Sequence, residues 1–355
     1  MTPLYILLGI VAVVAIVAAI FLNTPKFGGT PSGKRLERME KSPNYRNGAF
    51  HNREVTPMMT SNKNFFQSMW EFLFSKDENL KPNHPLDMEK SNLKSIPRTK
   101  DYIVWFGHSS YLIQVNGKRF LVDPVFGPAS PVKFMIKPFK GTTKYDVDDL
   151  PDIDYLVITH DHWDHLEYET VAALEPRVRR VVCPLGVGAH FEKWGYPSSK
   201  LLELDWDEVS NPKPDVKINC LTARHFSGRG LKRNGTLWAS YLIETPGFNF
   251  FVGGDSGYGK HFKEIGEKFA GQIDLAMLEN GQYDQGWKYI HTLPKYQANV
   301  MKDLNARNNI TVHHSKYALA HHPWDEPLKT ELKIRNEGEA PVTVLKLGRP
   351  TPIVK

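Results

Sequence analysis

The sequence contains little cysteine. Its 355 residues include two, Cys183 and Cys220. Two thiols are too few for a disulfide framework or for a four-thiolate zinc site. Both lie in apolar segments that are typical of strands, so we expect two buried thiols.

The sequence also lacks a strong excess of charge. It has 45 Lys and Arg against 39 Asp and Glu, a net charge of +6 that is spread along the chain. It has no run of Lys and Arg interleaved with aromatic residues, the pattern typical of nucleic-acid binding, so we predict that nucleic acid is not a partner. With 41% hydrophobic and 24% charged residues, the composition is that of a packed globular protein and excludes a disordered chain.

A long apolar run stands at the N-terminus. The range 4–22 carries no charged residue and spans about 28 Å as a helix, close to the ~30 Å thickness of a bilayer core. No Lys or Arg precedes it, unlike the start of a signal peptide, so we predict an uncleaved transmembrane anchor at residues 1–22. The positive-inside rule then predicts a single-pass protein of the cell membrane whose catalytic domain faces the cytoplasm, because the basic residues follow the anchor: Lys26, Lys34, Arg35, Arg38 and Lys41.

The range 23–97 is rich in Gly, Pro, Asn and Ser and is predicted to be a linker. One aromatic stretch in it, at 62–75, predicts an amphipathic helix. This helix can pack on the main domain, or it can lie in the lipid interface beside the anchor.

Short apolar runs recur after residue 97. They predict strands at Tyr102–Phe106, Tyr111–Val115, Phe120–Val122, Tyr155–Thr159, Val178–Val182, Lys217–Leu221, Trp238–Ile243, Phe248–Val252, Leu275–Leu278, Ile310–Val312 and Val342–Leu345. Helical patterns lie between some of them, at Tyr168–Leu174, Val187–Trp194, Gly257–Phe269 and Lys295–Leu304. We therefore expect the range 98–355 to be an α/β domain of sheets covered by helices.

The strongest candidate site directly follows the apolar run at 155–158. Its residues read Thr159-His160-Asp161-His162-Trp163-Asp164-His165. Clustered imidazoles and carboxylates are ligands of zinc and similar metals. Because alternate residues of an extended loop face the same way, His160 and His162 can share one metal while Asp164 and His165 turn toward a second.

Three later strands are each followed by a further candidate ligand: His225, Asp255 and His313. Taken singly, each residue is a weak signal. Together with the first cluster they give five His and two Asp, a set that suits two metals about 3.5–4 Å apart with one carboxylate bridging them.

Several segments around these residues add to the pattern. They are Gly107-His108-Ser109-Ser110, Leu121-Val122-Asp123-Pro124-Val125-Phe126, Arg224-His225-Phe226-Ser227-Gly228-Arg229, Gly254-Asp255-Ser256-Gly257-Tyr258-Gly259 and Glu279-Asn280-Gly281-Gln282-Tyr283. With the order H-x-H-x-D-H, His, Asp, His, they resemble the metallo-β-lactamase superfamily. Within it, they look like the N-acyl-phosphatidylethanolamine-hydrolysing phospholipase D branch and its bacterial relatives. The resemblance covers the chain from about Ile96 to Leu347.

The resemblance implies an αββα sandwich with two zinc ions per chain. The ligands that it implies are His160, His162 and His225 for one ion and Asp164, His165 and His313 for the other, with Asp255 bridging. It also implies substrate contacts at Trp163 and His291.

Alternatives stay open at three positions, and a fourth departs from the family motif. His314 is the alternative last ligand, Trp163 is alternatively a packing residue, and His291 is alternatively an ordinary loop residue. Lys316 stands where the family motif has a small hydroxyl residue, which bears on substrate specificity.

The chemistry that follows is hydrolysis of a phosphodiester. A zinc pair lowers the pKa of bound water to about 7 and offsets charge on phosphoryl oxygens. We expect His291 to be the general acid and Asp164 a metal-bound proton acceptor.

The anchor, the aromatic helix and the basic apolar loop at 132–140 suit a membrane interface, so a phospholipid is the expected substrate. The predicted reaction converts N-acyl-phosphatidylethanolamine to phosphatidic acid and an N-acylethanolamine. Two other functions compete with it: a lactonase-type metal-dependent hydrolase of a small soluble substrate, and a non-catalytic metal-binding membrane protein.

Overall fold

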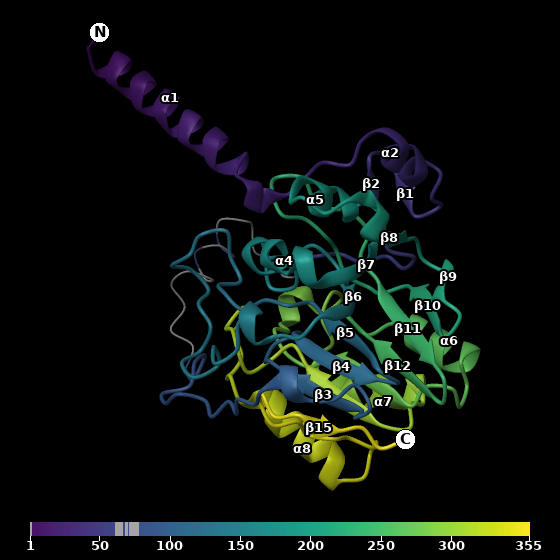
Figure 1. Ribbon diagram of the computed structural model, residues 1–355. Coiled ribbons are helices and arrows are strands. Elements are labelled where there is room, and N and C mark those ends of the chain that lie inside the picture. The colour runs from purple at the N-terminus through teal and green to yellow at the C-terminus, as the bar shows by residue number, and fades with distance from the viewer. Residues whose placement is uncertain (1, 61–66, 68–69, 71–77) are drawn as a thin grey trace.

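The computed structural model of the chain describes residues 2–60, 67, 70 and 78–355. Two β-sheets lie face to face, and helices cover their outer faces (Figure 1). The αββα sandwich predicted from the sequence is therefore confirmed.

The first sheet has seven strands in the order β15-β3-β4-β5-β6-β7-β8. Their bounds are β3 (Tyr102–Trp105), β4 (Tyr111–Val115), β5 (Lys118–Val122), β6 (Ile153–Val157), β7 (Val178–Pro184), β8 (Leu201–Leu204) and β15 (Thr351–Pro352). Strands β5 to β8 run parallel to one another, while β15, β3 and β4 pair antiparallel.

The second sheet has six strands in the order β14-β13-β12-β11-β10-β9. Their bounds are β9 (Val209–Lys213), β10 (Val216–Leu221), β11 (Ser240–Thr245), β12 (Phe248–Val252), β13 (Leu275–Glu279) and β14 (Asn309–Val312). Strands β12, β13 and β14 are parallel. Each sheet thus contains a group of parallel strands, and the carboxyl ends of these strands lie on the same side of the sheet.

Side chains alternate between the two faces of each sheet. In β3, Ile103 and Trp105 enter the core between the sheets, whereas Tyr102 and Val104 face the helices outside. This alternation follows from the two-residue period of a strand. Because both faces of the central strands are buried, most of their residues are apolar.

The outer faces are covered by helices that connect successive strands of the sheets or, for α8, follow β14. The first sheet packs against α4 (Tyr168–Leu174) and α5 (Gly188–Lys193). The second sheet packs against α6 (His261–Lys268), α7 (Pro294–Leu304) and α8 (Glu326–Asn336). Three of the four predicted helices match within two residues at each end, but the helix expected at Gly257–Phe269 is shorter, and α8 was not predicted.

Every predicted strand has a counterpart except Val342–Leu345. In that segment Val342 forms a single bridge to Asn309 and no ladder follows. Leu345 is nevertheless buried in the core between the sheets. The apolar pattern there reflects burial at an edge without strand pairing, so the prediction of a strand was wrong.

The N-terminal helix α1 (Thr2–Leu22) extends away from the sandwich (Figure 1). Its residues 3–22 are long and apolar enough to cross a membrane by length and composition, and that window has no buried share. The predicted anchor therefore has a matching helix.

The predicted linker packs against the sandwich. It contains helix α2 (Gly33–Glu40) and the hairpin of β1 (Tyr45–Arg46) and β2 (Ala49–Phe50), and it buries Met39, Phe50, Met88 and Leu93 in the two neighbouring cores. The aromatic helix expected at 62–75 lies outside the described residues except for positions 67 and 70. The division into 1–22, 23–97 and 98–355 stays a prediction.

Candidate metal centre

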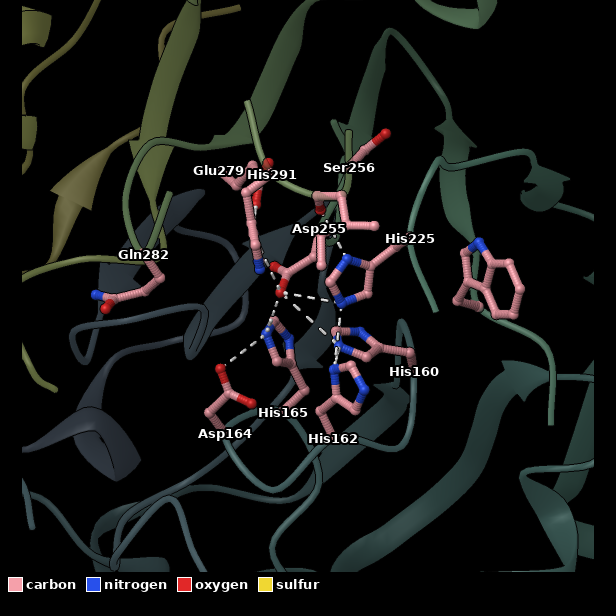
Figure 2. A network of polar contacts seen from close by, with 12 residues as sticks. His160, His162, Asp164, His165, His225, Asp255, Ser256, Glu279, Gln282 and His291 are labelled. Atoms are coloured by element: carbon pink, nitrogen blue, oxygen red, sulfur yellow. Dashed lines mark hydrogen bonds and ion pairs between the residues drawn. The ribbon is translucent and has the colours of Figure 1, made fainter. Parts of the chain in front are cut away.

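The candidate ligands meet where the parallel strands of both sheets end. The loop 160–165 follows β6, Asp255 follows β12, His313 follows β14, and His225 lies in the loop after β10. Loops at strand ends are held in place by the rigid sheets beneath them. Residues far apart in the sequence therefore converge on one point, which Figure 2 shows from close by.

Asp255 lies at the centre of this cluster (Figure 2). Its Oδ2 is 3.2 Å from His165 Nε2 and 3.1 Å from His313 Nε2. On its other side, Oδ2 is 3.8 Å from His160 Nε2 and 3.7 Å from His225 Nε2. One carboxylate oxygen thus faces two groups of imidazoles, as a bridging ligand must.

The first group consists of His160, His162 and His225. His162 Nδ1 lies 2.9 Å from His160 Nε2 and 3.2 Å from His225 Nε2. The three nitrogens are close enough to one another to share one cation.

The second group consists of Asp164, His165 and His313. Asp164 Oδ2 lies 3.5 Å from His165 Nε2 and 3.4 Å from His313 Nε2. These three atoms, together with Asp255 Oδ2, surround a second point within the cluster.

The imidazoles are oriented by hydrogen bonds at their other ring nitrogens. The Nδ1 atoms of His160, His165, His225 and His313 lie within 2.7–3.2 Å of Thr159 Oγ1, Asp123 Oδ2, Ile290 O and Gly281 O, respectively. Metal-binding histidines are typically held in this way, because a hydrogen bond at one nitrogen fixes the ring and leaves the other free for the metal. In all four, Nε2 is the nitrogen that faces the cluster.

The donor set fits two divalent cations. Two ligands of a tetrahedral zinc, each at about 2.0–2.1 Å, lie roughly 3.3 Å apart. The distances are 2.9 and 3.2 Å in the first group and 3.5 and 3.4 Å in the second, so all four lie close to that value. Among the described residues, His165 Nε2, His313 Nε2 and Asp255 Oδ1 are buried without a hydrogen-bond partner. Buried polar atoms are rarely left unpaired, so a cation is the partner that these atoms suit.

The electrostatics around the second group favour positive charge, whereas burial lowers the pKa of the three histidines of the first group. Burial alone lowers the pKa of His313, but the carboxylates of Asp255 and Asp164 outweigh it and raise that pKa to about 10. Burial alone raises the pKa of Asp255, yet His165 and His313 hold it well below its usual range. A site that binds protons this tightly suits a metal cation in their place.

His291 lies beside the cluster and is held by Glu279. His291 Nδ1 is 2.7 Å from Glu279 Oε2, and the backbone N–H of Thr292 donates to Glu279 Oε1 at 2.6 Å. The ring of His291 stacks on that of His313 with centroids 5.2 Å apart. Its Nε2 is the nitrogen that this carboxylate leaves free, and the side chain lines the cleft described below.

His108 is a functional residue for which the sequence predicted no role. Its Nε2 donates a hydrogen bond to Asp164 Oδ2 at 2.8 Å. Burial and the neighbouring His313 lower the pKa of His108 to about 3, so its ring is neutral and carries its proton on the nitrogen that faces the carboxylate. His108 follows β3 with a φ of 52°, a left-handed conformation that turns the chain sharply at this point.

A cleft of about 260 Å³ opens over the cluster. Its polar lining includes His162, Asp164, Asp255, His291 and His313 together with Arg233 and Gln282, and its apolar walls are Met58, Met59, Phe226, Trp287, Ile290 and Leu319. The site therefore combines a candidate metal pair with apolar surface.

One wall of the cleft comes from the predicted linker. Asn52 Nδ2 donates to His225 O at 2.7 Å, and Asn52 Oδ1 accepts from His225 N at 3.2 Å. Arg224 donates to Thr56 Oγ1 and to Val55 O, which fixes the segment that precedes Met58. No local sequence pattern predicts these contacts, because they join segments more than 160 residues apart.

Trp163 points away from the metal cluster. Its ring lies 5.2 Å from that of Phe27 and 4.0 Å from the Arg229 guanidinium. It lines a separate cleft of about 200 Å³ with Lys26 and Lys133. Its predicted contact with substrate stays a prediction.

The structure places His313, not His314, in the cluster. His314 Nδ1 lies 2.8 Å from Ser315 Oγ, its Nε2 lies 3.2 Å from Thr311 Oγ1, and its ring packs on Trp105. Lys316 is fully buried outside the cleft, where its Nζ donates to Phe106 O and Val125 O. Lys316 therefore links the loop after β3 to the loop after β5.

Known proteins resemble this chain in sequence. A family model described as "Beta-lactamase superfamily domain" matches residues 118–314. The chain is 36% identical over 313 residues to an uncharacterized protein of Mycobacterium tuberculosis, which covers 86% of this chain and 83% of that protein. It is 34% identical over 239 residues to N-acyl-phosphatidylethanolamine-hydrolyzing phospholipase D 1 of Caenorhabditis elegans, which covers 61% of this chain and 65% of that protein.

Solved structures share the fold. A metallo hydrolase from the archaeon Ignicoccus hospitalis superposes with a TM-score of 0.55 at 18% identity, over 72% of this chain and 99% of that protein. At this identity the likeness concerns the fold alone. Together with the family match, it confirms the resemblance that the sequence motifs predicted.

Proposed function

Because this chain belongs to the metallo-β-lactamase superfamily and is a metal-dependent hydrolase, we propose that it uses two zinc ions to cleave a phosphodiester of a membrane phospholipid. The observation that carries the proposal is the convergence of six candidate ligand side chains around a seventh, Asp255, beneath a cleft with apolar walls. The proposed substrate is N-acyl-phosphatidylethanolamine, and the products are phosphatidic acid and an N-acylethanolamine. The similarity to the C. elegans protein named for this hydrolysis supports that choice.

The proposed ligands of one zinc are His160, His162 and His225, those of the other are Asp164, His165 and His313, and Asp255 bridges the two. The chemistry that such a pair supplies when bound is a water nucleophile that ionises near neutral pH and a counter-charge for the phosphoryl oxygens. His108 keeps the Asp164 carboxylate turned toward this site. We propose that Asp164 accepts a proton during hydrolysis.

We propose that His291 donates a proton to the leaving alkoxide. Glu279 accepts the hydrogen bond from His291 Nδ1, which fixes the ring and presents Nε2 to the cleft. A positioned general acid of this kind contributes roughly 10²–10⁴-fold to the rate.

The lining of the cleft supports an amphipathic anion as substrate. The walls made by Met58, Phe226 and Trp287 suit an acyl chain, and the Arg233 guanidinium at the rim suits a phosphate. Trp163, in the neighbouring cleft beside Lys26 and Lys133, is proposed as a second lipid contact.

We propose that α1 anchors the chain in the cell membrane and that the hydrolase domain faces the cytoplasm. The apolar composition of α1 supports the anchor, and the basic residues that follow it support the orientation. A reporter fused after Lys355 tests the orientation, because reporter activity confined to the external face contradicts it.

The experiment that tests the function compares the intact protein with Asp255→Ala. Metal content is measured by elemental analysis, and hydrolysis is measured with a fluorogenic N-acyl-phosphatidylethanolamine. We expect two metals per chain and turnover in the intact protein, and loss of both in the variant. Asp87→Ala, which removes an exposed carboxylate far from the cluster, is the matched control.

Two results contradict parts of the proposal. Two metals without turnover of the lipid exclude the substrate and leave the metal site standing, and lactones and soluble phosphodiesters are then the substrates to test. Retention of both metals in Asp255→Ala excludes the bridging role of this carboxylate.

A further inference from the structure

The loop 228–235 projects from the sandwich between the end of α1 and the metal cleft. Leu231, near its tip, is 88% exposed, and the two residues that follow, Lys232 and Arg233, are exposed as well. A single exposed leucine is ordinary on a protein surface, so its meaning depends on the features that lie beside the loop.

The two sides of this loop face different features of the molecule. Leu231 and Lys232 line a cavity of about 600 Å³ together with Leu22, the last residue of α1. Arg233 instead lines the metal cleft, with its guanidinium 5.9 Å from the Phe226 ring. The loop therefore spans the distance between the helix that leaves the domain and the candidate metal pair.

The base of the loop is tied to the segment that follows α1. Arg229 is buried and donates from Nε and Nη2 to Lys26 O at 3.1 and 2.9 Å. From Nη1 it donates to Asp161 O, in the metal loop, at 2.9 Å. One guanidinium thus joins the loop, the segment after α1 and the loop that carries the metal ligands.

Further contacts fix the direction in which α1 leaves the domain. Trp194 Nε1, at the end of α5, donates to Pro25 O at 2.7 Å, and Lys193 Nζ donates to Gly28 O at 2.8 Å. Figure 1 shows α1 leaving the molecule beside α5. Because the segment after α1 is docked on the domain, the loop 228–235 has a set position relative to the end of the helix.

A second exposed tip lies beside the same segment. Phe134 is 76% exposed in the loop 131–137, next to Lys133, which shares a cleft with Lys26. Lys26 Nζ also approaches Pro131 O, at 3.4 Å. Two tips that combine an exposed apolar residue with cations thus flank the point where α1 leaves the domain.

We infer that the loop 228–235 contacts the surface of an anionic lipid bilayer. Leu231 is inserted at the boundary between the head groups and the acyl chains, and Lys232 is paired with lipid phosphates. A bilayer is the occupant that the observations favour, because the membrane-spanning candidate α1 ends beside this loop and cations next to an apolar tip complement an anionic interface. In this orientation Arg233 stands between the bilayer and the metal cleft, where it receives the phosphate of an incoming lipid. This last role rests on the proposed function, whereas the contact with the bilayer does not.

The contact is tested with a fluorescent probe at the tip of the loop. The full chain carrying Leu231→Cys is labelled with an environment-sensitive thiol dye and reconstituted into vesicles of phosphatidylcholine and phosphatidylglycerol. The native Cys183 and Cys220 are buried, so the dye reports on the new position. Val354→Cys is the matched control, because Val354 is 91% exposed near the C-terminus.

We expect the Leu231→Cys probe to be quenched several-fold more than the Val354→Cys probe by a spin label held at shallow depth in the lipid. We also expect it to be shielded several-fold from iodide in the water. Equal exposure of the two probes to iodide overturns the inference. Neither measurement requires turnover, so both can still be interpreted if the proposed phospholipase activity is absent.

An activity measurement separates the loop from the chemistry. Leu231→Gln should lower hydrolysis of vesicle substrate several-fold and leave hydrolysis of a short-chain, monomeric phosphodiester unchanged. Val354→Gln should change neither rate. An equal loss of both rates in Leu231→Gln contradicts a role at the membrane, because it indicates damage to the site itself.

Discussion

Replacing Glu279 with Gln tests whether this carboxylate positions His291 for proton donation. Glu279 accepts two hydrogen bonds, from His291 Nδ1 at 2.7 Å and from the backbone N–H of Thr292 at 2.6 Å. The amide of Gln has one oxygen for these two donors, so its NH₂ group must face one of them. The backbone N–H cannot change its role, and His291 is therefore the partner that loses its acceptor.

The size of the effect follows from the bond that is lost. A hydrogen bond to a charged group contributes about 1.5–3 kcal/mol, and about 1.36 kcal/mol in the barrier is a tenfold change in rate. We expect kcat for N-acyl-phosphatidylethanolamine, whose alkoxide leaving group needs a proton, to fall roughly 10- to 150-fold. For a nitrophenyl phosphodiester, whose leaving group needs no proton, kcat should change little.

The assay compares the two substrates at equal metal content, which elemental analysis checks. Glu331→Gln is the matched control, because Glu331 is also a buried glutamate but lies in α8, where it accepts a hydrogen bond from Thr311 Oγ1. An equal fall on both substrates refutes the reasoning, as does loss of metal, since either result gives Glu279 a role other than positioning His291.

Other variants test the second layer of the site and the stability of the fold. His108→Ala removes the donor to Asp164 and should weaken metal binding roughly 10–100-fold in a chelator competition; unchanged affinity contradicts that role. His313→Ala should lower the metal content measured by elemental analysis, while His314→Ala should leave it unchanged. Burial raises the pKa of Glu331 from 4.5 to about 7, so the folded chain holds this proton more tightly than the unfolded chain and loses stability as pH rises through this window. In denaturant unfolding, Glu331→Gln should therefore gain on the order of 3 kcal/mol over the wild type above pH 7 and nothing below pH 4.5; a pH-independent difference contradicts this account.

The sequence predicted the central strands because their patterns are dictated by burial on both faces. The segment Phe248–Val252, for example, is apolar at every position except Asn249, and the strand there has the predicted bounds. Edge strands carry no such signal. Strand β9 (Val209–Lys213) contains Asn211 and Pro212 and alternates between exposed and half-buried positions, and its pairing with β10 decides its conformation. Tertiary contact, not local pattern, determines such segments.

The residues of the site likewise divide into those that a local pattern predicts and those that only tertiary contacts bring together. The residues of the metal loop are contiguous, so their chemistry is readable from the sequence. The groups that orient the ligands are not contiguous: His108 comes from the turn after β3, and Asn52 comes from the predicted linker. Their partners are set by how the two sheets close on each other, which no spacing along the chain encodes.

The ligand set is divided between the two sheets, and this division has a consequence for folding. The metal loop follows β6 of one sheet, whereas His225, Asp255 and His313 belong to loops of the other. An ion held between the two sheets would cross-link distant parts of the folded chain. It would stabilise the fold because it binds the native state and not the unfolded one. Both cysteines are buried and unpaired, so a bound ion, and not a disulfide, would join the two sheets and couple their unfolding.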